Sequence, residues 1–217
     1  MSARTRLLLI RHGQPREEAL GRCYGTLDIG LSKRGLRQAR RLARILDGVD
    51  LAAIYSSPRQ RAQETAEALA QVHGLAPILD ERLCEIDFGE FEGMTYDEIA
   101  REHPRLYRRW METPTEIEFP NGESYEQLKA RALLALASIL EVHRRETVAV
   151  VSHGGVARAM LADCLSISDP DVFRIDQSYG ALSIVDWIDG VPIVRLMNGH
   201  TDVDGCEGRG FVPALPQ

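Results

Sequence analysis

The stretch that decides the fold is "LLLIRHGQP" at residues 7–15, in which four aliphatic residues stop at Arg11 and His12 and a glycine follows. An apolar run this short, bounded by turn residues, is typical of a strand buried on both faces, and such strands belong to parallel or mixed sheets covered by helices. Arg11 and His12 then lie at the carboxyl end of the strand. Ligands bind at this edge of an open α/β sheet, because loops leave the strands there and helices point their positive N-termini at the same crevice.

Two further segments end in the same way. The apolar run "LAAIYSS" at residues 51–57 is followed by Arg59 and Arg61, and "TVAVVS" at residues 147–152 is followed by His153. Helical patterns separate these runs, so strands and helices alternate along the chain, as in α/β folds with a mainly parallel sheet. If the three strands are neighbours in one sheet, we expect their arginines and histidines to meet in one crevice.

The predicted helices carry end signals. Ser32 and Ser124 are expected to be N-caps, the latter in a capping box with the glutamine three residues later. The helix after the second strand is predicted to begin at Pro58, with Ser57 as its cap, and to stop at Gly74. The arginines on the outer face of the first helix are interpreted as a solvated surface.

At 217 residues the chain is long enough for one sizeable core, and we predict a single domain over residues 1–217. Residues 86–123 are less regular and rich in proline, and we interpret them as a cap-like excursion from the sheet. The last two apolar runs are joined through Asp189 and Gly190, which predicts a closing hairpin.

Composition and charge disfavour several classes of protein. Hydrophobic residues make up 44% and charged residues 27%, as in ordinary soluble globular proteins, and the net charge of −6 argues against a non-specific nucleic-acid-binding protein. No run approaches the roughly 20 apolar residues of a membrane helix, and the N-terminus lacks a signal-peptide pattern. The four cysteines are scattered without a C-x-x-C pair, so we expect reduced thiols and a location in the cytoplasm.

A crevice with two arginines, two histidines and helix N-termini is an anion site, and the planar guanidinium fork favours a phosphoryl group over a carboxylate. Hydrolysis of a phosphomonoester then requires a nucleophile, neutralisation of charge and a proton for the leaving oxygen. A neutral histidine nitrogen can attack phosphorus and form a phosphohistidine that water later hydrolyses. Flanking arginines favour the neutral imidazole and are expected to lower its pKa below the usual value near 6.5.

The proton donor is expected among the carboxyl groups of "LCEIDFGEFEG" at residues 83–93. Glu85 is flanked by apolar residues, and partial burial beside a phosphate dianion favours its protonated form. Asp87, Glu90 and Glu92 are competitors of the same chemical type, and their spacing does not choose among them.

A metallohydrolase is a rival interpretation, with His12, His153 and His200 as ligands together with carboxylates. Arg11 beside His12 would repel a cation, and the sequence lacks ligand spacing such as H-x-x-x-H. We therefore expect no metal ion and no cofactor at the site.

Five segments together resemble the histidine phosphatase superfamily, also called the phosphoglycerate mutase-like family. A lone "RHG" is a weak signal, whereas all five segments in this order are a strong one. The segments are "RHG" at 11–13, "GTLDIGLSKRG" at 25–35, "SSPRQRAQETA" at 56–66, "LCEIDFGEFEG" at 83–93 and "VSHGG" at 151–155.

The resemblance implies a three-layer α/β/α sandwich and assigns a role to each site residue. His12 looks like the phosphorylated nucleophile, with Arg11 and Arg61 as phosphate ligands. Glu85 looks like the general acid, which then becomes the base that activates water. His153 resembles the second histidine, which holds phosphoryl oxygens and stabilises charge in the transition state.

Gly154 lies in the last of these segments and Gln14 directly follows the first, and we expect both to bind the substrate. The first loop departs from the family, with Glu18 where many members carry asparagine and Pro15 where threonine or serine is commoner. In this loop we expect Gln14 to donate the phosphate contact.

The resemblance implies a phosphatase of the α-ribazole phosphatase branch or its broad-specificity relatives, acting on a small phosphomonoester. The excursion between Glu85 and His153 is moderate, and the first loop lacks the pattern of the bisphosphoglycerate-dependent phosphoglycerate mutases. Such a mutase is one alternative. A non-catalytic phospho-ligand binding module on the same fold is another, disfavoured because His12 and Glu85 are both present. We expect no nucleic-acid or membrane partner, and the sequence leaves a homodimer open.

Overall fold

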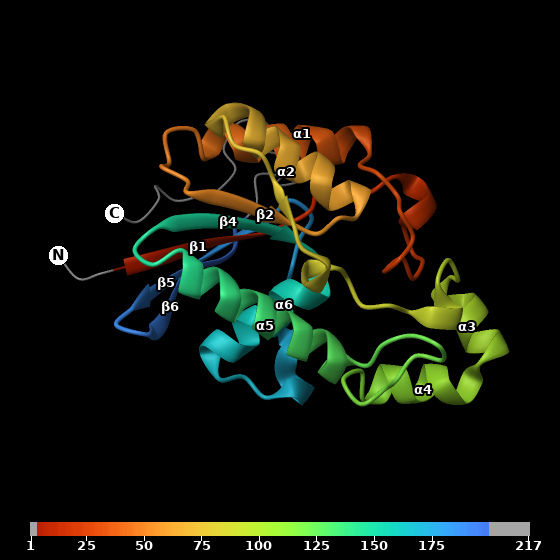
Figure 1. Cartoon of the computed structure of the whole chain (residues 1–217). Coiled ribbons are helices and arrows are strands. Elements are labelled where there is room, and N and C mark those ends of the chain that lie inside the picture. Colours follow the sequence, from red (N-terminus) through yellow and green to blue (C-terminus); the bar gives the residue numbers. More distant parts are fainter. Residues whose placement is uncertain (1–3, 200–217) are drawn as a thin grey trace.

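The computed structural model describes residues 4–199 and contains a six-stranded sheet in the order β3-β2-β4-β1-β5-β6 (Figure 1). The strands β3, β2, β4 and β1 are parallel, whereas β5 runs antiparallel to both of its neighbours. The strands are β1 (Arg4–Arg11), β2 (Ala53–Ser56), β3 (Ile78–Leu79), β4 (Thr147–Ser152), β5 (Leu182–Ile188) and β6 (Val191–Gly199). The predicted mostly parallel sheet is confirmed.

Helices α1 and α2 cover one face of the sheet, and α5 and α6 cover the other (Figure 1). The helices are α1 (Lys33–Ile45), α2 (Gln60–His73), α3 (Tyr96–Glu102), α4 (Pro104–Glu112), α5 (Tyr125–Val142) and α6 (Gly154–Leu165), with short 3-10 helices at Glu17–Ala19, Glu81–Leu83, Gly89–Phe91 and Asp169–Arg174. This arrangement confirms the three-layer α/β/α sandwich. Among the residues that the structure describes, no helix has the length and apolar character needed to cross a membrane.

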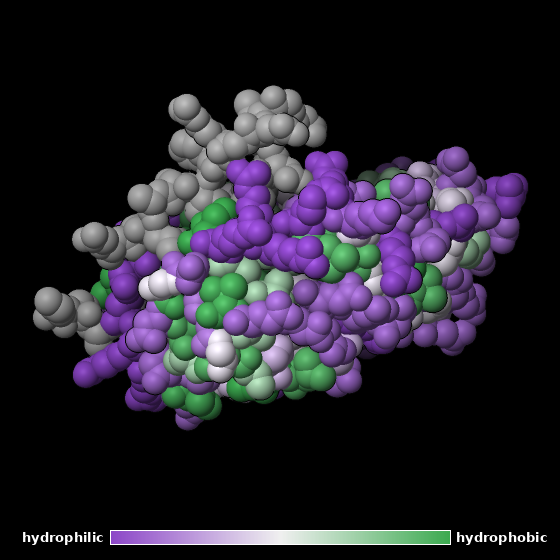
Figure 2. Space-filling model, turned by 90° about the horizontal axis from the view of Figure 1, so that it is seen from above, coloured by the Kyte–Doolittle hydropathy of each residue, from purple (hydrophilic) through white to green (hydrophobic). Residues whose placement is uncertain are grey.

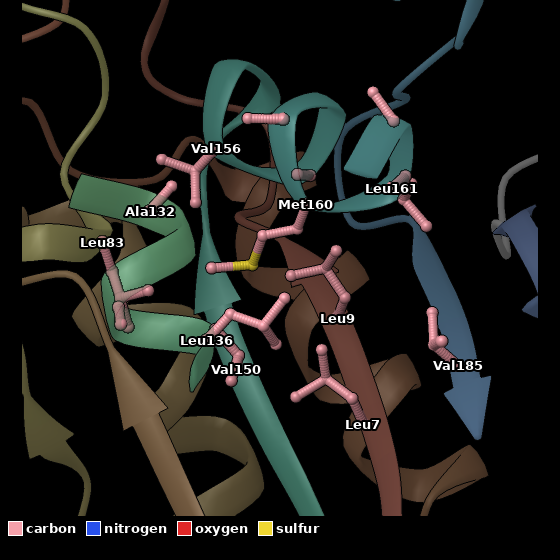
Figure 3. Packing of buried hydrophobic residues seen from close by; sticks show 14 of the residues in the cluster. Leu7, Leu9, Leu83, Ala132, Leu136, Val150, Val156, Met160, Leu161 and Val185 are labelled. Atoms are coloured by element: carbon pink, nitrogen blue, oxygen red, sulfur yellow. The ribbon is translucent and has the colours of Figure 1, made fainter. Parts of the chain in front are cut away.

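Alternate residues of the central strands supply two hydrophobic cores, one for each face of the sheet. Leu7 and Leu9 of β1 pack with α5 and α6, as Figure 3 shows, while Leu8 and Ile10 pack with α1 and α2. These four side chains are at most 2% exposed. Because both faces are covered by helices, the apolar run is continuous instead of alternating with polar residues.

Most helix ends follow the predicted signals. The Ser32 hydroxyl accepts the backbone N–H of Gly35 at 3.1 Å, and Ser124 forms the expected capping box with Gln127. Helix α2 ends at Gly74, whose φ of 66° lies in the left-handed region that favours glycine. These three predictions are confirmed. They could be made from the sequence because each signal acts on neighbours within one turn of the helix.

The closing hairpin and the solvated helix face are also confirmed. Asp189 and Gly190 join β5 to β6 with φ values of 53° and 83°, and positive φ at both central residues is typical of a tight hairpin turn. On α1, Arg37, Arg40 and Arg44 are exposed. Figure 2, seen from the side of α1 and α2, shows a mainly hydrophilic surface with separate hydrophobic patches.

The predicted start of α2 is wrong by two residues. The helix begins at Gln60, not at Pro58, and Ser57 is not its cap. The Ser57 Oγ instead lies 2.8 Å from Nε2 of His153, and the first free N–H of the helix, that of Gln60, donates to Asp28 Oδ1 at 2.7 Å. Contacts with distant segments therefore replace the local cap that the sequence pattern favoured.

Residues 86–123, here called the cap, contain no strand of the sheet and contribute Trp110 and Phe119 to a largely aromatic cluster that also includes Cys23. Helices α3 and α4 of this cap lie beyond the edge at which β1, β2 and β4 end (Figure 1). The first loop joins the cap through Cys23, which donates its N–H to the Met94 carbonyl at 3.0 Å. The cap therefore faces the crevice at the carboxyl edge of the sheet.

Candidate active site

The carboxyl ends of β1, β4 and β2 meet side by side. His12 donates its backbone N–H to the Ser152 carbonyl at 2.9 Å, and Ser57 donates its own to the Val151 carbonyl at 3.0 Å. The ring centroids of His12 and His153 are 5.1 Å apart. The structure thus brings together residues that the sequence placed at three separate strand ends.

His12 is buried, and the backbone sets its tautomer. Its Nδ1 lies 2.7 Å from the Gly13 carbonyl oxygen, which can only accept, so Nδ1 carries the proton and Nε2 keeps its lone pair. Burial, followed by the charges of Arg61 and Arg11, holds the pKa of His12 well below its ordinary value of 6.5, against the smaller opposing effect of the Gly13 carbonyl. At neutral pH the imidazole is therefore neutral, as expected from the sequence, and Nε2 can act as a nucleophile.

His153 is fully buried and has one bonded and one unbonded nitrogen. Its Nε2 lies 2.8 Å from the Ser57 hydroxyl, while its Nδ1 is buried without a hydrogen-bond partner among the described residues. Burial, then the charge of Arg61, lower the pKa of His153 well below 6.5, so this ring is also neutral at neutral pH; a protonated His12 would lower that pKa further. If Ser57 donates to Nε2, the proton of His153 is on Nδ1 and available to a bound oxygen atom.

Arg11 and Arg61 place two guanidinium groups beside these rings. Arg61 is fully buried and donates to three carbonyl oxygens of the first loop at 2.8 to 3.0 Å. Arg11 donates to the Gln177 carbonyl and lies 4.0 Å from the ring centroid of Tyr179. The Nε atoms of both arginines are buried without a partner, and within residues 4–199 neither side chain forms an ion pair. Two cations without an ion-pair partner among the described residues, set beside buried rings, attract an anion.

Glu85 points its carboxylate at the beginning of α6. Its Oε2 accepts the N–H of Gly155 at 3.1 Å, and its Oε1 accepts the N–H of Ile86 at 3.0 Å. Its backbone carbonyl accepts from Arg131 at 3.0 Å, and Arg131 is held in turn by two bonds to Glu123 at 2.7 and 2.8 Å. The half-buried carboxyl group is therefore held from both its main chain and its side chain.

The structure separates the four carboxyl groups that the sequence left open. Glu92 accepts backbone N–H groups of the first loop and of Phe88 at 2.8 to 3.1 Å, which makes it part of the loop framework. Asp87 accepts the N–H of Gly89 at 2.8 Å, and Glu90 is exposed on the outer surface. Glu85 is the member of this group that reaches the start of α6, next to His153.

Gln14 and Gly154, the two remaining candidates for substrate binding, differ in their contacts. The hydrogen bonds at Gln14 involve its backbone, which donates to the Gln38 side chain at 2.8 Å and accepts from Ser32. Gly154 begins α6, and a Cβ there would lie 3.1 Å from Nη1 of Arg158 and 3.5 Å from Cζ of Arg11. Glycine thus leaves room for two guanidinium groups beside the helix N-terminus. A phosphate contact from the Gln14 side chain remains a prediction.

Two tyrosines at the site were missed from the sequence. The hydroxyls of Tyr24 and Tyr179 are 2.6 Å apart, and their ring centroids are 6.4 and 5.7 Å from that of His12. Tyr179 lies three residues before the start of β5, which runs antiparallel to β1 and so starts at the edge where β1 ends. A search of the residues before the predicted hairpin could have found Tyr179, whereas the position of Tyr24 depends on how the first loop folds.

Two cavities meet at Glu85. One, here called the apolar cavity, has a volume of about 180 Å³, and its lining includes Phe88, Trp110, Phe119, Tyr125, Leu128 and Arg158. The other, here called the polar cavity, has a volume of about 370 Å³, and its lining includes Arg59, Glu81, Cys84, Asp87, Glu123 and Arg131. The candidate proton donor can therefore be reached from two chemically different sides.

The part of the chain that the structure describes holds no group of three or more His, Cys, Asp or Glu side chains that could bind a metal ion. His200, a ligand in the rival metallohydrolase interpretation, lies outside the described residues. The chemistry of the described site is instead that of buried guanidinium and imidazole groups around an anion.

Comparison with known proteins agrees with this chemistry. Phosphoserine phosphatase 1 of Hydrogenobacter thermophilus is 38% identical over 162 residues, which cover 75% of this chain and 77% of that protein. The metal-independent phosphoserine phosphatase of Arabidopsis thaliana is 35% identical over 159 residues, covering 72% of this chain and 67% of that protein. The crystal structure of the α-ribazole phosphatase from Shigella flexneri matches with a TM-score of 0.81 at 27% identity, covering 89% of this chain and 96% of that one.

The family comparison covers nearly the whole chain. The family model described as histidine phosphatase superfamily (branch 1) matches residues 7–200, which include all five segments that carry the resemblance. The solved α-ribazole phosphatase shares the fold of this chain and is also similar to it in sequence. The chain therefore belongs to branch 1 of the histidine phosphatase superfamily, and it is a phosphatase.

Proposed function

We propose that the protein is a metal-independent phosphomonoester hydrolase that forms a phosphohistidine at His12. Its substrate is a small phosphorylated metabolite, such as α-ribazole phosphate or one of a broader group of monoesters. The observation that carries this proposal is the state of His12: a neutral ring with Nδ1 bonded to Gly13 and a free Nε2, set beside Arg11 and Arg61 with their unpaired charges.

In the first step Nε2 of His12 attacks phosphorus while the bond from phosphorus to the leaving oxygen breaks. Glu85 gives its proton to that oxygen, so that a neutral alcohol leaves. Arg11, Arg61 and Nδ1–H of His153 hold the other phosphoryl oxygens. Their unsatisfied donors are in place before the substrate arrives, which lowers the cost of reorganisation in the transition state.

In the second step water hydrolyses the phosphohistidine. Glu85, now a carboxylate, takes a proton from the water. The water oxygen bonds to phosphorus while the bond between phosphorus and Nε2 of His12 breaks. Inorganic phosphate leaves, and Glu85 is protonated again for the next cycle. One carboxyl group therefore serves both steps, first as acid and then as base.

The alternatives make different predictions for the same site. A bisphosphoglycerate-dependent mutase would return the phosphoryl group to another alcohol and release no phosphate. A non-catalytic binding module would hold the phosphoryl group without forming a phosphoenzyme. Phosphoserine is a second candidate substrate, because two relatives above 30% identity carry that activity in their names.

The test is phosphate release from a panel of monoesters in the presence of a chelator. The panel contains α-ribazole phosphate, phosphoserine, sugar phosphates and 3-phosphoglycerate. We expect release that falls to background in His12→Asn and persists in the matched control His143→Asn, whose ring lies at the end of α5 against Tyr55. Release that survives His12→Asn, or isomerisation of 3-phosphoglycerate without release, would overturn the proposal.

The location of the chain belongs to the same proposal. Cys23, Cys84 and Cys164 are free thiols in the structure, which is typical of proteins from a reducing compartment. We infer a cytoplasmic enzyme with a small-molecule partner. The homodimer that the sequence left open is tested by sedimentation of the purified chain.

A further inference from the structure

The apolar cavity reaches the proposed proton donor, Glu85. Glu85 and Gly155 both line it, and the Gly155 N–H donates to the Glu85 carboxylate at 3.1 Å. A Cβ at Gly155 would lie 2.4 Å from Oε1 of Glu85, so glycine is what lets the carboxyl group occupy this position. An alcohol that takes its proton from Glu85 can place its remaining atoms in this cavity.

The walls of the apolar cavity are largely aromatic. The rings of Phe88, Trp110 and Phe119 pack against one another with centroids 5.0 to 6.0 Å apart, and Tyr96 stacks on Trp110 at 5.3 Å. The volume of about 180 Å³ is close to that of an apolar cavity of about 150 Å³ that takes up benzene. The cavity therefore suits one ring with a small substituent.

Two hydrogen-bond donors interrupt these apolar walls. Tyr125 is 5% exposed, and its hydroxyl oxygen is buried without a partner among the described residues. Burial raises the pKa of Tyr125 to about 12, so the hydroxyl keeps its proton. Arg158 donates Nε to the Ile175 carbonyl at 2.8 Å, and its terminal nitrogens have no partner within residues 4–199. Together they offer a place for an acceptor group, and best for a carboxylate.

The polar cavity on the other side of Glu85 fits such a ligand less well. Its lining contains four carboxyl groups, those of Glu81, Glu85, Asp87 and Glu123. Arg131 in the same wall is already paired with Glu123 at 2.7 Å. The two arginines of this wall, Arg59 and Arg131, do not balance its four carboxyl groups, so an anionic substituent is repelled there, and a ring would give up its apolar contacts.

We propose that the substrate is the phosphate ester of an alcohol that carries one aromatic ring and a carboxylate or similar acceptor. The ring lies in the apolar cavity, and the acceptor meets Tyr125 and Arg158. This inference rests on the proposed function, since it identifies the alcohol that Glu85 protonates. Phosphoserine has a carboxylate that could meet Tyr125 and Arg158, but it has no ring and therefore leaves the aromatic walls of the cavity uncovered.

The first test compares four esters of primary alcohols with the wild-type enzyme: ethyl phosphate, benzyl phosphate, 4-carboxybenzyl phosphate and phosphoserine. We expect kcat/KM to rise about 10-fold to 100-fold from ethyl to benzyl phosphate, because a ring is buried, and to rise again with the carboxylate. A kcat/KM for phosphoserine equal to or above that for 4-carboxybenzyl phosphate would overturn the inference.

The second test removes the unpartnered hydroxyl alone. We expect Tyr125→Phe to lower kcat/KM for 4-carboxybenzyl phosphate about tenfold more than for benzyl phosphate. Tyr55→Phe is the matched control, because it removes a tyrosine hydroxyl that bonds to His143 at the other end of α5. Equal losses with the two esters in Tyr125→Phe would contradict an acceptor site at this residue.

A binding measurement separates this inference from the proposed function. The probe is 4-carboxybenzylphosphonate, which cannot be hydrolysed, with ethylphosphonate as its reference, and calorimetry gives both Kd values. Tighter binding of the carboxybenzyl compound, by at least about tenfold, supports the inference even if no ester is turned over and the proposed function fails. Turnover of all four esters at similar kcat/KM, with similar Kd values for the phosphonates, overturns the inference while the proposed function stands.

Discussion

The two cavities that meet at Glu85 differ in both size and chemistry. The apolar cavity is the smaller, at about 180 Å³, with aromatic walls, whereas the polar cavity measures about 370 Å³ and is lined mainly by charged side chains. In the proposed mechanism the leaving alcohol and the attacking water come to Glu85 in turn, and the apolar cavity is the one that offers apolar contacts to the alcohol. The two sides of Glu85 therefore differ in the chemistry of the groups that they can receive.

The largest expected effect comes from the group that both cavities share. Glu85→Gln keeps the shape of the side chain and removes its proton, so we expect kcat to fall by about 10²-fold to 10⁴-fold with alkyl esters. With 4-nitrophenyl phosphate, whose leaving group needs no proton, the loss in the first step should be much smaller. Rapid-quench measurement of alcohol release checks this, and equal losses with both esters would show that Glu85 does not protonate the leaving oxygen.

A smaller effect is expected from Ser57, whose hydroxyl lies 2.8 Å from Nε2 of His153. Ser57→Ala leaves Nε2 of His153 buried without a partner, and we expect kcat to fall about 10-fold. Nitrogen NMR of His153 should show its proton on Nδ1 in the wild type and a mixture of tautomers in the variant. Ser57→Thr keeps the hydroxyl, and failure of this variant to restore a single tautomer would contradict the positioning role.

The walls themselves can be compared by one substitution in each. Phe119→Leu removes aromatic surface from the apolar cavity, and Arg59→Gln changes the charge of the polar cavity with little change in size. We expect KM for benzyl phosphate to rise about 3-fold to 10-fold in the first variant and to change less than about twofold in the second. The reverse order would place the leaving group in the polar cavity.

The smallest effect concerns stability in acid. Because His12 and His153 have lowered pKa values in the folded state, the unfolded chain binds more protons than the folded one below about pH 6.5. Their contribution to the free energy of unfolding is complete above that pH and is lost as the pH falls, by up to about 1.4 kcal/mol per pH unit for each histidine. Urea denaturation of His153→Gln between pH 7 and 5 should show a shallower dependence than the wild type, and an unchanged slope would contradict the burial of a neutral ring.

Much of the fold could be predicted because its signals are local. Continuous aliphatic runs such as residues 7–10 mark strands covered on both faces, and caps such as Ser32 act within one turn of helix. The start of α2 could not be predicted in this way, because the Ser57 hydroxyl forms a hydrogen bond with His153, 96 residues away, and does not cap the helix. A local signal fails where the same side chain has a distant partner.

The residues of the candidate site also differ in whether the sequence alone could identify them. His12 and His153 could be named from the sequence, because parallel strands bring the residues after their carboxyl ends to one edge of the sheet. The choice of Arg61 over Arg59 came from the family resemblance. The roles of these residues in catalysis remain proposals that the experiments above test.

By itself the sequence determined the alternation of strands and helices, the two layers of helices implied by the family resemblance, and the arginines and histidines at the crevice. Only the tertiary structure decided which of four carboxyl groups reaches α6, that Tyr24 and Tyr179 close over His12, and that Tyr125 and Arg158 lie in one aromatic cavity. The physical reason is that residues after parallel strands always meet at one edge of the sheet, so local sequence patterns are enough to place them. The positions of the other side chains depend on how α5, α6 and the cap pack, and this packing brings together residues that are far apart in the chain.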